Sequence, residues 1–280
     1  MLTVTYDSPL IACRLCQSRD ISWYHRDYRN NNIYKCGNCG VQFMNPQYDD
    51  RYLEQYYAAY TQEEPKWDEA LYYGHSFYLS LIEQYISKGK LLDFGAGKGI
   101  LVKAAHDRGW NAMGYDVDCQ AMNQVGEKLG IKMFCGDFNK IDFEPKSFDV
   151  VTLHQVLEHL KSPRAYLETI TSILRDGGIL FLACPNIRSF SSTLKFFLEK
   201  LGIRKRKVGS YYDTDHHLWY FTHSTLSRLL RDFNYEILDI RSGHQCRPRQ
   251  SRLVRFWMRN ITERFVWKSS FLMILRKLKQ

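Results

Sequence analysis

The sequence contains no long apolar run. No stretch of its 280 residues approaches the ~20 consecutive apolar residues that a membrane-spanning helix needs. The first residues, Met1 to Asp7, also lack the basic start and the apolar core of a secretory signal peptide. Hydrophobic residues make up 45% and charged residues 25%, the profile of an ordinary globular protein. We therefore expect a cytoplasmic protein with one substantial domain and a small accessory module.

Acidic residues are scarce in the C-terminal segment. From Arg241 to Gln280 there are eleven Lys and Arg but one acid, Glu263, whereas the net charge of the whole chain is +9. The first 240 residues therefore carry a net charge of −1. A second basic cluster lies at Arg204–Lys207. Charge localised in this way indicates contact with an anionic surface or ligand, and a nucleic-acid partner is the less favoured interpretation.

Half of the eight cysteines form one N-terminal group. Cys13 and Cys16 make one Cys-x-x-Cys pair, and Cys36 and Cys39 make a second pair nineteen residues later. Two such pairs can supply four thiolates to one tetrahedral Zn²⁺, which leaves no position for a catalytic water. We predict a structural zinc ribbon over residues 1–46, with short strands at 21–24 and 33–35. Because no export signal is present, reduced thiols are expected at the four scattered positions Cys119, Cys135, Cys184 and Cys246.

Aromatic side chains crowd residues 47–88. The helical spacing of Leu53, Tyr56, Tyr57 and Tyr60, and a second apolar run over 67–86, predict two helices. Aromatic residues in such a segment more often pack than bind ligands. We interpret it as a connector that docks on the main domain and can form a wall of the active site.

Strands and helices alternate from Lys90 onward. Strands are expected at 91–94, 111–116, 132–135, 148–154 and 178–183. A final antiparallel strand is expected at 271–275, pairing near 235–238. This alternation predicts an α/β domain over 89–280, with a largely parallel sheet and ligands at the carboxyl ends of its strands.

A glycine-rich turn follows the first of these strands. Glycines at 95, 97 and 99 allow a sharp turn and a close approach of the backbone to a ligand. Asp116 lies 17 residues beyond Gly99, at the tip of the second strand, where its carboxylate can accept both ribose hydroxyls. This arrangement suits either NAD or S-adenosylmethionine.

Two residues disfavour the dinucleotide. The dinucleotide pattern requires a third glycine at the position that Ile100 occupies. Asp93 also places a carboxylate beside the turn, which suits a cationic amino-acid group better than a phosphate. The turn therefore favours S-adenosylmethionine.

Over roughly residues 89–240 the sequence resembles the class I S-adenosylmethionine-dependent methyltransferases, which have a Rossmann-like sheet. Asp93-x-Gly95-x-Gly97-x-Gly99 is similar to their first motif, which wraps the methionine part of the cofactor. Gly136-Asp137-Phe138 is similar to their adenine-binding segment, with Asp137 near the amino group, and residues 148–159 resemble their fourth strand and its following helix. The resemblance implies that the cofactor is bound by Asp93, Gly95, Gly97, Gly99, Asp116, Asp137, Phe138 and His154.

A narrower resemblance covers nearly the whole chain. The segment 34–46, Pro185-Asn186 and His217-Leu218-x-x-Phe221-Thr222 look like a bacterial group of zinc-ribbon methyltransferases associated with sugar and surface-polysaccharide biosynthesis. The ubiquinone-biosynthesis O-methyltransferases are also similar, but their Glu-x-x-Glu-His reads Gln155-x-x-Glu158-His159 here. Because the first acid is missing, we predict no catalytic divalent metal.

Transfer to a hydroxyl requires orientation and a base. Holding the acceptor in line with the S–CH₃ bond can contribute ~7–11 kcal/mol, and a general base ~10²–10⁴-fold. The candidate bases are His154, His159 and His217. His159 can instead orient its helix, and His154 can contribute backbone contacts alone. The predicted acceptor is a small molecule or glycan, with a hydroxyl of a sugar or lipid-linked intermediate favoured.

Two insertions exceed the bare fold, near 187–216 and 244–269. Each predicts an amphipathic helix that covers the acceptor pocket or, being flanked by basic residues, also touches the anionic inner face of the membrane. Two other functions stay open: an RNA methyltransferase that grips phosphates with the ribbon and basic tail, and a non-enzymatic cofactor-binding protein. The fourth strand lacks the Asn/Asp-Pro-Pro-aromatic motif of base-amino methyltransferases, which weakens the RNA hypothesis.

Overall fold

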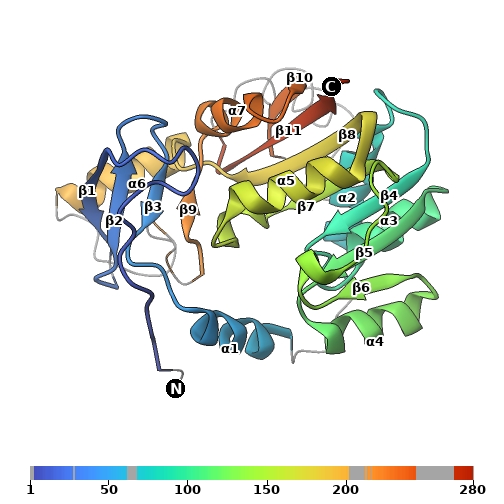
Figure 1. The fold of residues 1–280 in the computed structure, drawn as a ribbon, viewed down its shortest axis with the longest axis horizontal. Helices are drawn as coiled ribbons and strands as arrows, with labels where there is room; N and C mark the ends of the chain where they lie inside the picture. Colours follow the sequence, from blue (N-terminus) through green and yellow to red (C-terminus); the bar gives the residue numbers. More distant parts are fainter. Residues whose placement is uncertain are drawn as a thin grey trace.

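The computed structural model describes residues 3–27, 29–61, 68–201, 212, 214, 216–243 and 268–279. Its centre is a seven-stranded sheet with the strand order β10-β11-β8-β7-β4-β5-β6 (Figure 1). The strands are β4 (Lys90–Phe94), β5 (Asn111–Asp116), β6 (Met133–Cys135), β7 (Phe148–His154), β8 (Leu174–Pro185), β10 (Tyr235–Ser242) and β11 (Ser270–Lys277). Only β11 among them runs antiparallel to its neighbours β8 and β10, whereas the other pairs are parallel. The predicted Rossmann-like sheet with an antiparallel final strand is confirmed.

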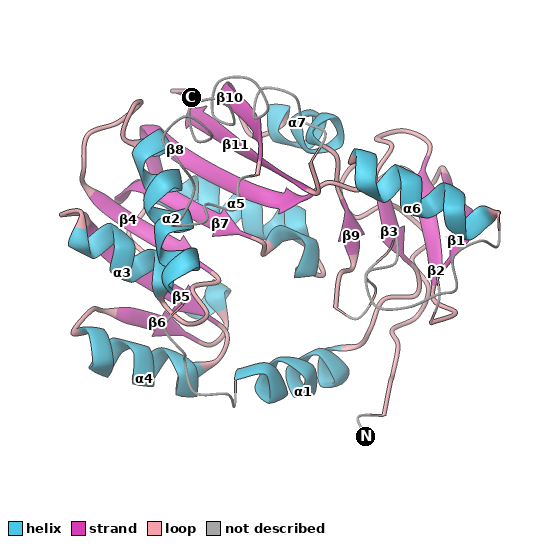
Figure 2. Ribbon diagram, turned by 180° about the vertical axis from the view of Figure 1, so that it is seen from behind, coloured by secondary structure: helices cyan, strands magenta, loops and turns pink. Residues whose placement is uncertain are grey.

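Helices cover both faces of this sheet because its central strands are apolar on both sides. Val151 and Leu153 of β7 pack into one core cluster, with α5 (Pro163–Ile173), whereas Val150 packs into the other. That second cluster lies under α2 (Glu69–Ile82) and α3 (Ile100–Asp107) (Figure 2). The remaining helices of the domain are α4 (Cys119–Leu129) and α7 (His223–Arg231).

The chain after β7 differs from the expected helix. Residues Leu157–His159 form a single 3-10 turn, η2, and the α-helix begins only at Pro163. Proline suits the first turn of a helix because its missing N–H has no partner there. The consequence is that Glu158 and His159 lie in a short loop at the carboxyl end of the sheet.

The N-terminal strands form a second sheet that extends beyond the predicted ribbon. Its order is β1-β2-β3-β9, all antiparallel, with β1 (Ile21–Arg26), β2 (Asn32–Cys36) and β3 (Gln42–Met44). The fourth strand, β9 (Trp219–Tyr220), comes from the C-terminal half of the chain and pairs with β3. This pairing joins the ribbon to β9 and so places residues 216–218, which immediately precede β9, next to the ribbon.

The helices predicted for the connector and for the first insertion are both present. The connector contains α1 (Asp50–Thr61) and α2. The first insertion contains α6 (Phe190–Lys200), which lies beside β1 to β3 in Figure 2 and contacts β1 through Phe196 and His25, with ring centroids 5.3 Å apart. The second predicted insertion helix, Arg204–Lys207 and Cys246 lie outside the described residues. Among the residues that are described, no helix has the length and apolarity to cross a bilayer.

Candidate active site

The four N-terminal cysteines come together as predicted. Their sulfurs all lie within 4.8 Å of one another, with Cys13 and Cys39 at 3.7 Å and Cys16 and Cys36 at 3.5 Å. A tetrahedral zinc with Zn–S bonds of ~2.3 Å places its sulfurs about 3.8 Å apart. The backbone N–H of Cys39 also approaches the sulfur of Cys36, at 3.5 Å. The cluster fits a structural Zn²⁺ held by all four side chains.

The glycine turn after β4 has the conformation that the motif requires. Gly95 has φ +80°, and a Cβ on it would lie 2.4 Å from a methyl of Val156. Gly99 has φ +69° and caps α3, and a Cβ there would lie 2.4 Å from Val125. Both positions combine a left-handed backbone with a close neighbour, so only glycine fits. The turn is thereby fixed against β5, where Gly95 and Ala96 donate backbone hydrogen bonds to Tyr115 O at 2.7 and 2.8 Å.

Two carboxylates flank this turn. Asp116 accepts the backbone N–H of Gly97 at 2.9 Å, and burial raises the pKa of its carboxyl. Asp93 is buried at the end of β4 and accepts the hydroxyl of Thr152 at 2.7 Å. Burial raises the pKa of Asp93 to about 7, and the negative charge of Asp116 adds to the rise. A cationic ligand at this edge would relieve the repulsion between the two, as expected for a sulfonium cofactor with an ammonium group.

The predicted adenine segment divides into an exposed and a buried part. Asp137 caps the short helix η1 (Phe138–Lys140) by accepting the N–H of Asn139 at 3.1 Å, and it stays accessible at the surface. Phe138 is 1% exposed and packs against Phe94 and Tyr115 at ring-centroid distances of 4.7 and 4.8 Å. The side chain of Phe138 is therefore part of the core, so any contact of this residue with a ligand would have to come from its backbone.

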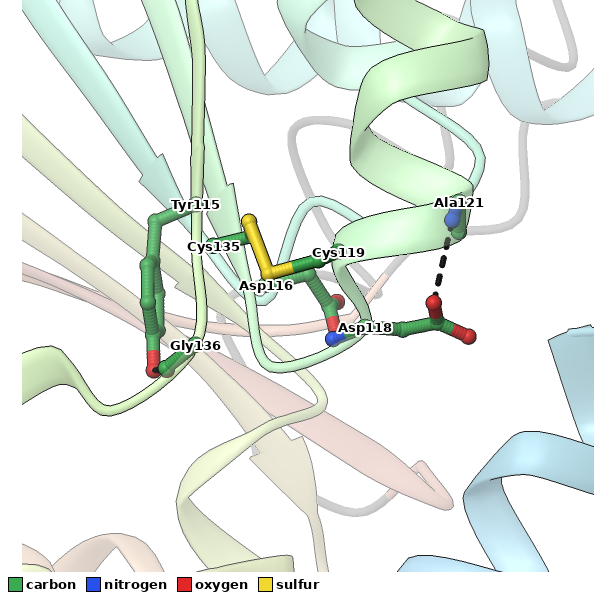
Figure 3. The surroundings of a disulfide bond; sticks show 7 residues. All are labelled: Tyr115, Asp116, Asp118, Cys119, Ala121, Cys135 and Gly136. Atoms are coloured by element: carbon green, nitrogen blue, oxygen red, sulfur yellow. Dashed lines mark hydrogen bonds between the residues drawn. A yellow bond between two sulfur atoms is a disulfide. The ribbon is translucent and has the colours of Figure 1, made fainter.

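A disulfide joins Cys119 to Cys135, which corrects the expected reduced state of these two thiols (Figure 3). Cys119 begins α4 and Cys135 ends β6, with Cα atoms 4.8 Å apart. Parallel pairing places Cys135 of β6 beside Asp116 of β5. Because α4 begins at Cys119, just after β5, the two cysteines meet although they are 16 positions apart. The bridge links the segment after Asp116 to the one before Gly136, the two segments that the sequence assigns to ribose and adenine. Cys184, the third scattered thiol that the structure describes, is free and buried, as expected.

His154 lies apart from the other predicted histidines. Its ring contacts His75 and Tyr78 of α2, with centroids 4.8 and 5.4 Å away. Burial lowers the pKa of His154 to about 4. The imidazole is therefore neutral, and it faces the side of the sheet that α2 covers.

His159 and His217 do come together, and His216 joins them. The ring of His159 lies 4.8 Å from each of the other two, and the rings of His216 and His217 lie 4.5 Å apart. Burial lowers the pKa of His217 to about 3, and the neighbouring His216 lowers it further. From α1, Tyr56 donates to or accepts from His216 Nδ1 at 3.0 Å, and the ring of Tyr57 lies 6.2 Å from that of His159. The aromatic connector thus lines the site.

The zinc-ribbon region holds the segment that carries His216 and His217. Tyr48 donates its hydroxyl to Thr214 O at 2.8 Å, and Asn31 donates to Thr214 Oγ1 at 3.1 Å. The hydroxyl of Thr214 in turn bonds to the carboxylate of Asp27. All four residues are buried.

An open hollow lies beside this cluster, where β8 ends. It measures about 410 Å³, its solvent-facing part included. Pro185 and Ile187 line it together with polar and aromatic side chains: Asn186, Ser192, His217, Trp219, Tyr220 and Ser269. His217 is therefore the member of the cluster that a ligand in the hollow would meet.

A family model described as a methyltransferase domain matches residues 63–240, more than half of the chain. The chain is an S-adenosylmethionine-dependent class I methyltransferase. Its cofactor is S-adenosylmethionine, and the residues at the ends of β4 and β5 fit that group by their turn and their charge. The bound cofactor supplies an activated methyl group on a positively charged sulfur.

The similar proteins agree on the fold. The ubiquinone biosynthesis O-methyltransferase of Coxiella burnetii is 31% identical over 123 residues, 41% of this methyltransferase and 52% of that protein. An S-adenosylmethionine-dependent methyltransferase from Archaeoglobus fulgidus superposes with a TM-score of 0.53 at 16% identity, covering 82% of this chain and all of the other. The 1,6-didemethyltoxoflavin N1-methyltransferase of Burkholderia thailandensis, solved with 1,6-didemethyltoxoflavin and S-adenosylhomocysteine, superposes at 0.51 and 15% identity, covering 82% and 85%. This methyltransferase spans about half the length of the curated ubiquinone-biosynthesis relatives it matches.

Sequence reasoning misses several members of the site. The Cys119–Cys135 bridge and the contact of Tyr56 with His216 carry no local signal. The sequence marks His216 only as the neighbour of His217. A signal does exist for Glu158, since it aligns with an acid of the ubiquinone-biosynthesis motif. Its burial at 0% exposure, with a pKa raised by that burial to about 8, follows only from the tertiary structure.

Proposed function

We propose that this methyltransferase methylates a hydroxyl of a small molecule or glycan, and that the acceptor occupies the hollow beside His217. The observation that carries the proposal is the position of the hollow: it opens at the carboxyl end of β8, beside the histidine cluster. Its mixed lining of amide, hydroxyl and aromatic groups suits a polar ring such as a sugar. The name of the Coxiella relative, an O-methyltransferase, agrees with transfer to oxygen.

The reaction asks three things of the chain. It must bind the acceptor with its oxygen in line with the S–CH₃ bond, keep water out, and accept the hydroxyl proton. Asp93, Asp116 and the glycine turn would hold the cofactor, which would supply the methyl group and keep the electron pair of the broken S–C bond on its sulfur. A neutral imidazole at His217 can take the hydroxyl proton directly.

We place His154 on the cofactor side. It lies at the tip of β7, and its ring faces α2 rather than the hollow. Substituting His154 should therefore weaken cofactor binding, whereas substituting His217 should lower turnover.

The test is transfer of radiolabelled methyl from S-adenosylmethionine into fractionated host extract, separated into lipid, nucleotide-sugar and glycan, and RNA pools. Asp116→Ala is the blank, because it removes the ribose-side carboxylate. His106→Ala is the matched control, since that side chain is exposed on α3. Label in the lipid or sugar pool, lost with His217→Ala and kept with His106→Ala, is expected. Label confined to RNA would overturn the proposal in favour of an RNA methyltransferase.

We further propose that α6 contacts an anionic membrane surface, which would suit a lipid-linked acceptor. Four apolar residues at helical spacing are exposed: Phe190 at 71%, Leu194 at 49%, Phe197 at 57% and Leu201 at 69%. In the sequence, the basic residues Arg204–Lys207 follow at once. Basic amphipathic segments bind such interfaces. Vesicles of anionic phospholipid should retain the protein, and Phe190→Ser/Phe197→Ser should release it; equal retention of both proteins would refute the contact.

A further inference from the structure

Three imidazoles meet at the edge of the proposed acceptor hollow. One nitrogen from each of His159, His216 and His217 lies within 4.8 Å of the other two. His159 sits in η2, whereas His216 and His217 come from the segment before β9. The backbone joins the two segments, because Leu218 donates to Glu158 O at 2.9 Å and His159 Nδ1 lies 3.2 Å from His216 O. The cluster is therefore built by two fixed segments rather than by mobile surface side chains.

We propose that His159, His216 and His217 bind one divalent transition-metal ion, distinct from the zinc of the four cysteines. Imidazole nitrogen favours Zn²⁺, Fe²⁺, Co²⁺, Ni²⁺ or Cu²⁺ over Mg²⁺ and Ca²⁺. Three protein ligands leave one position of a tetrahedral ion open, which is the arrangement of catalytic rather than structural zinc. Because His217 lines the hollow, the open position faces the place proposed for the acceptor.

The outer contacts concern the proton positions of two of the rings, His159 and His216, which lie stacked at 6° and must turn before both lone pairs can meet one ion. A backbone carbonyl only accepts, so the contact with His216 O suits a proton on Nδ1 of His159, a ring that also contacts the backbone carbonyl of Gln155. The hydroxyl of Tyr56 can likewise accept the Nδ1–H of His216, 3.0 Å away, which assigns Nε2 of that ring to the metal. Histidines that bind metals usually donate their second ring N–H to such a partner.

A buried acid lies beside the cluster, where a bound cation would favour its ionised form. The side chain of Glu158 is 1% exposed, and its Oε1 lies 3.8 Å from His159 Nε2. The carboxyl group interacts with the buried thiol of Cys184, but neither of its oxygens makes a hydrogen bond of good geometry with any residue the structure describes. A buried carboxylate without such partners is costly, and a neighbouring cation offsets that cost. Glu158 therefore favours a positively charged occupant of the cluster.

The spacing requires a modest closure of the rings. Nitrogens bound to a tetrahedral ion with Zn–N bonds of ~2.0–2.1 Å lie about 3.4 Å apart. Side-chain rotation that draws the nitrogens inward from their present 4.8 Å limit would complete the site. If the proposed hydroxyl acceptor is correct, its oxygen takes the open position and loses its proton more readily there. His217 then acts as a ligand, and all three histidines become necessary.

The experiment measures metal binding by the full chain with its ribbon zinc in place, without reading methyl transfer. Protein is dialysed against Co²⁺ and its bound zinc and cobalt are counted by elemental analysis. We expect about one zinc and one cobalt per chain, with a cobalt spectrum that lacks a thiolate charge-transfer band. His216→Ala/His217→Ala should lose the cobalt but keep the zinc, and His106→Ala should keep both. Tyr56→Phe should weaken cobalt binding by about 10–100-fold.

Each other outcome overturns the proposal. Wild-type protein that takes up no cobalt while it binds S-adenosylmethionine shows a cluster that only lines the pocket. Cobalt that persists in the double variant, or that shows thiolate bands, lies elsewhere. Because S-adenosylmethionine binding and ribbon zinc report the fold of each variant, lost cobalt is separable from unfolding. The proposed methyl acceptor would stand or fall by the labelling experiment alone.

Discussion

Breaking the Cys119–Cys135 bridge should lower both the stability of the domain and its affinity for S-adenosylmethionine. The bridge closes a chain segment with a sequence separation of 16 residues. Because a closed loop of that size lowers the entropy of the unfolded chain, the bridge contributes about 3 kcal/mol to the free energy of unfolding. For a domain of this size, loss of that free energy should lower the Tm by about 6–12 °C.

The bridge should also affect cofactor affinity. It joins the start of α4, just beyond Asp116, to the residue before Gly136-Asp137 (Figure 3). Without it, the two segments must be ordered when the cofactor binds, and ordering even one side chain costs about 0.5–1.5 kcal/mol. We therefore expect the Kd for S-adenosylmethionine to rise about 3–10-fold.

The assay compares wild type, wild type treated with a phosphine reductant, and Cys119→Ala/Cys135→Ala. Differential scanning calorimetry gives Tm, and isothermal titration gives the Kd. The reductant should lower the Tm of wild type to that of the double variant and leave the double variant unchanged. If alkylation under denaturing, non-reducing conditions modifies both thiols of the untreated protein, the bridge is absent from the native molecule and the reasoning fails.

Three further predictions concern the hydrogen bonds around Thr214, the glycine turn after β4 and the buried carboxyl group of Asp93. Thr214→Val removes a hydroxyl that is hydrogen-bonded to Asp27 and Asn31, and it leaves these two buried residues without that partner. It should therefore lower the free energy of unfolding by about 1–3 kcal/mol. It should also lower kcat, while the Kd for S-adenosylmethionine, measured by titration, stays near wild type. Gly95→Ala, with φ +80° and a contact of 2.4 Å, should abolish cofactor binding in the same titration, whereas alanine at Gly74, with no atom within 4 Å, should not. Because the pKa of Asp93 is raised to about 7, the cofactor-free protein should lose stability as pH rises from about 4 through 7, and Asp93→Asn should flatten that dependence in thermal melts; a slope that survives in this variant would assign it to another group.

The glycine turn and the strand ends that we assign to the cofactor could be predicted because their signals are local. The glycine turn reports a backbone conformation, and the strand ending in Asp116 reports its own position at the sheet edge. The Cys-x-x-Cys pairs likewise indicate a metal cluster, because each pair already forms a tight turn. The alternation of apolar strands and helices was sufficient to predict the sheet and its antiparallel last strand.

The acceptor half depended on contacts between distant residues. His159 and His216 are 57 positions apart, and their approach requires β9 to pair with β3 of the ribbon. A strand of two residues such as β9 is too short to show a periodicity in the sequence. Its place follows from packing against Phe43 and from the hydrogen bonds around Thr214. The disulfide is similar, because parallel pairing of β5 with β6 decides which cysteines meet. The sequence by itself determined the cofactor and which four cysteines come together. The tertiary structure decided which side chains surround the hollow proposed for the acceptor, because side-chain proximity across the fold is a property of packing and not of local pattern.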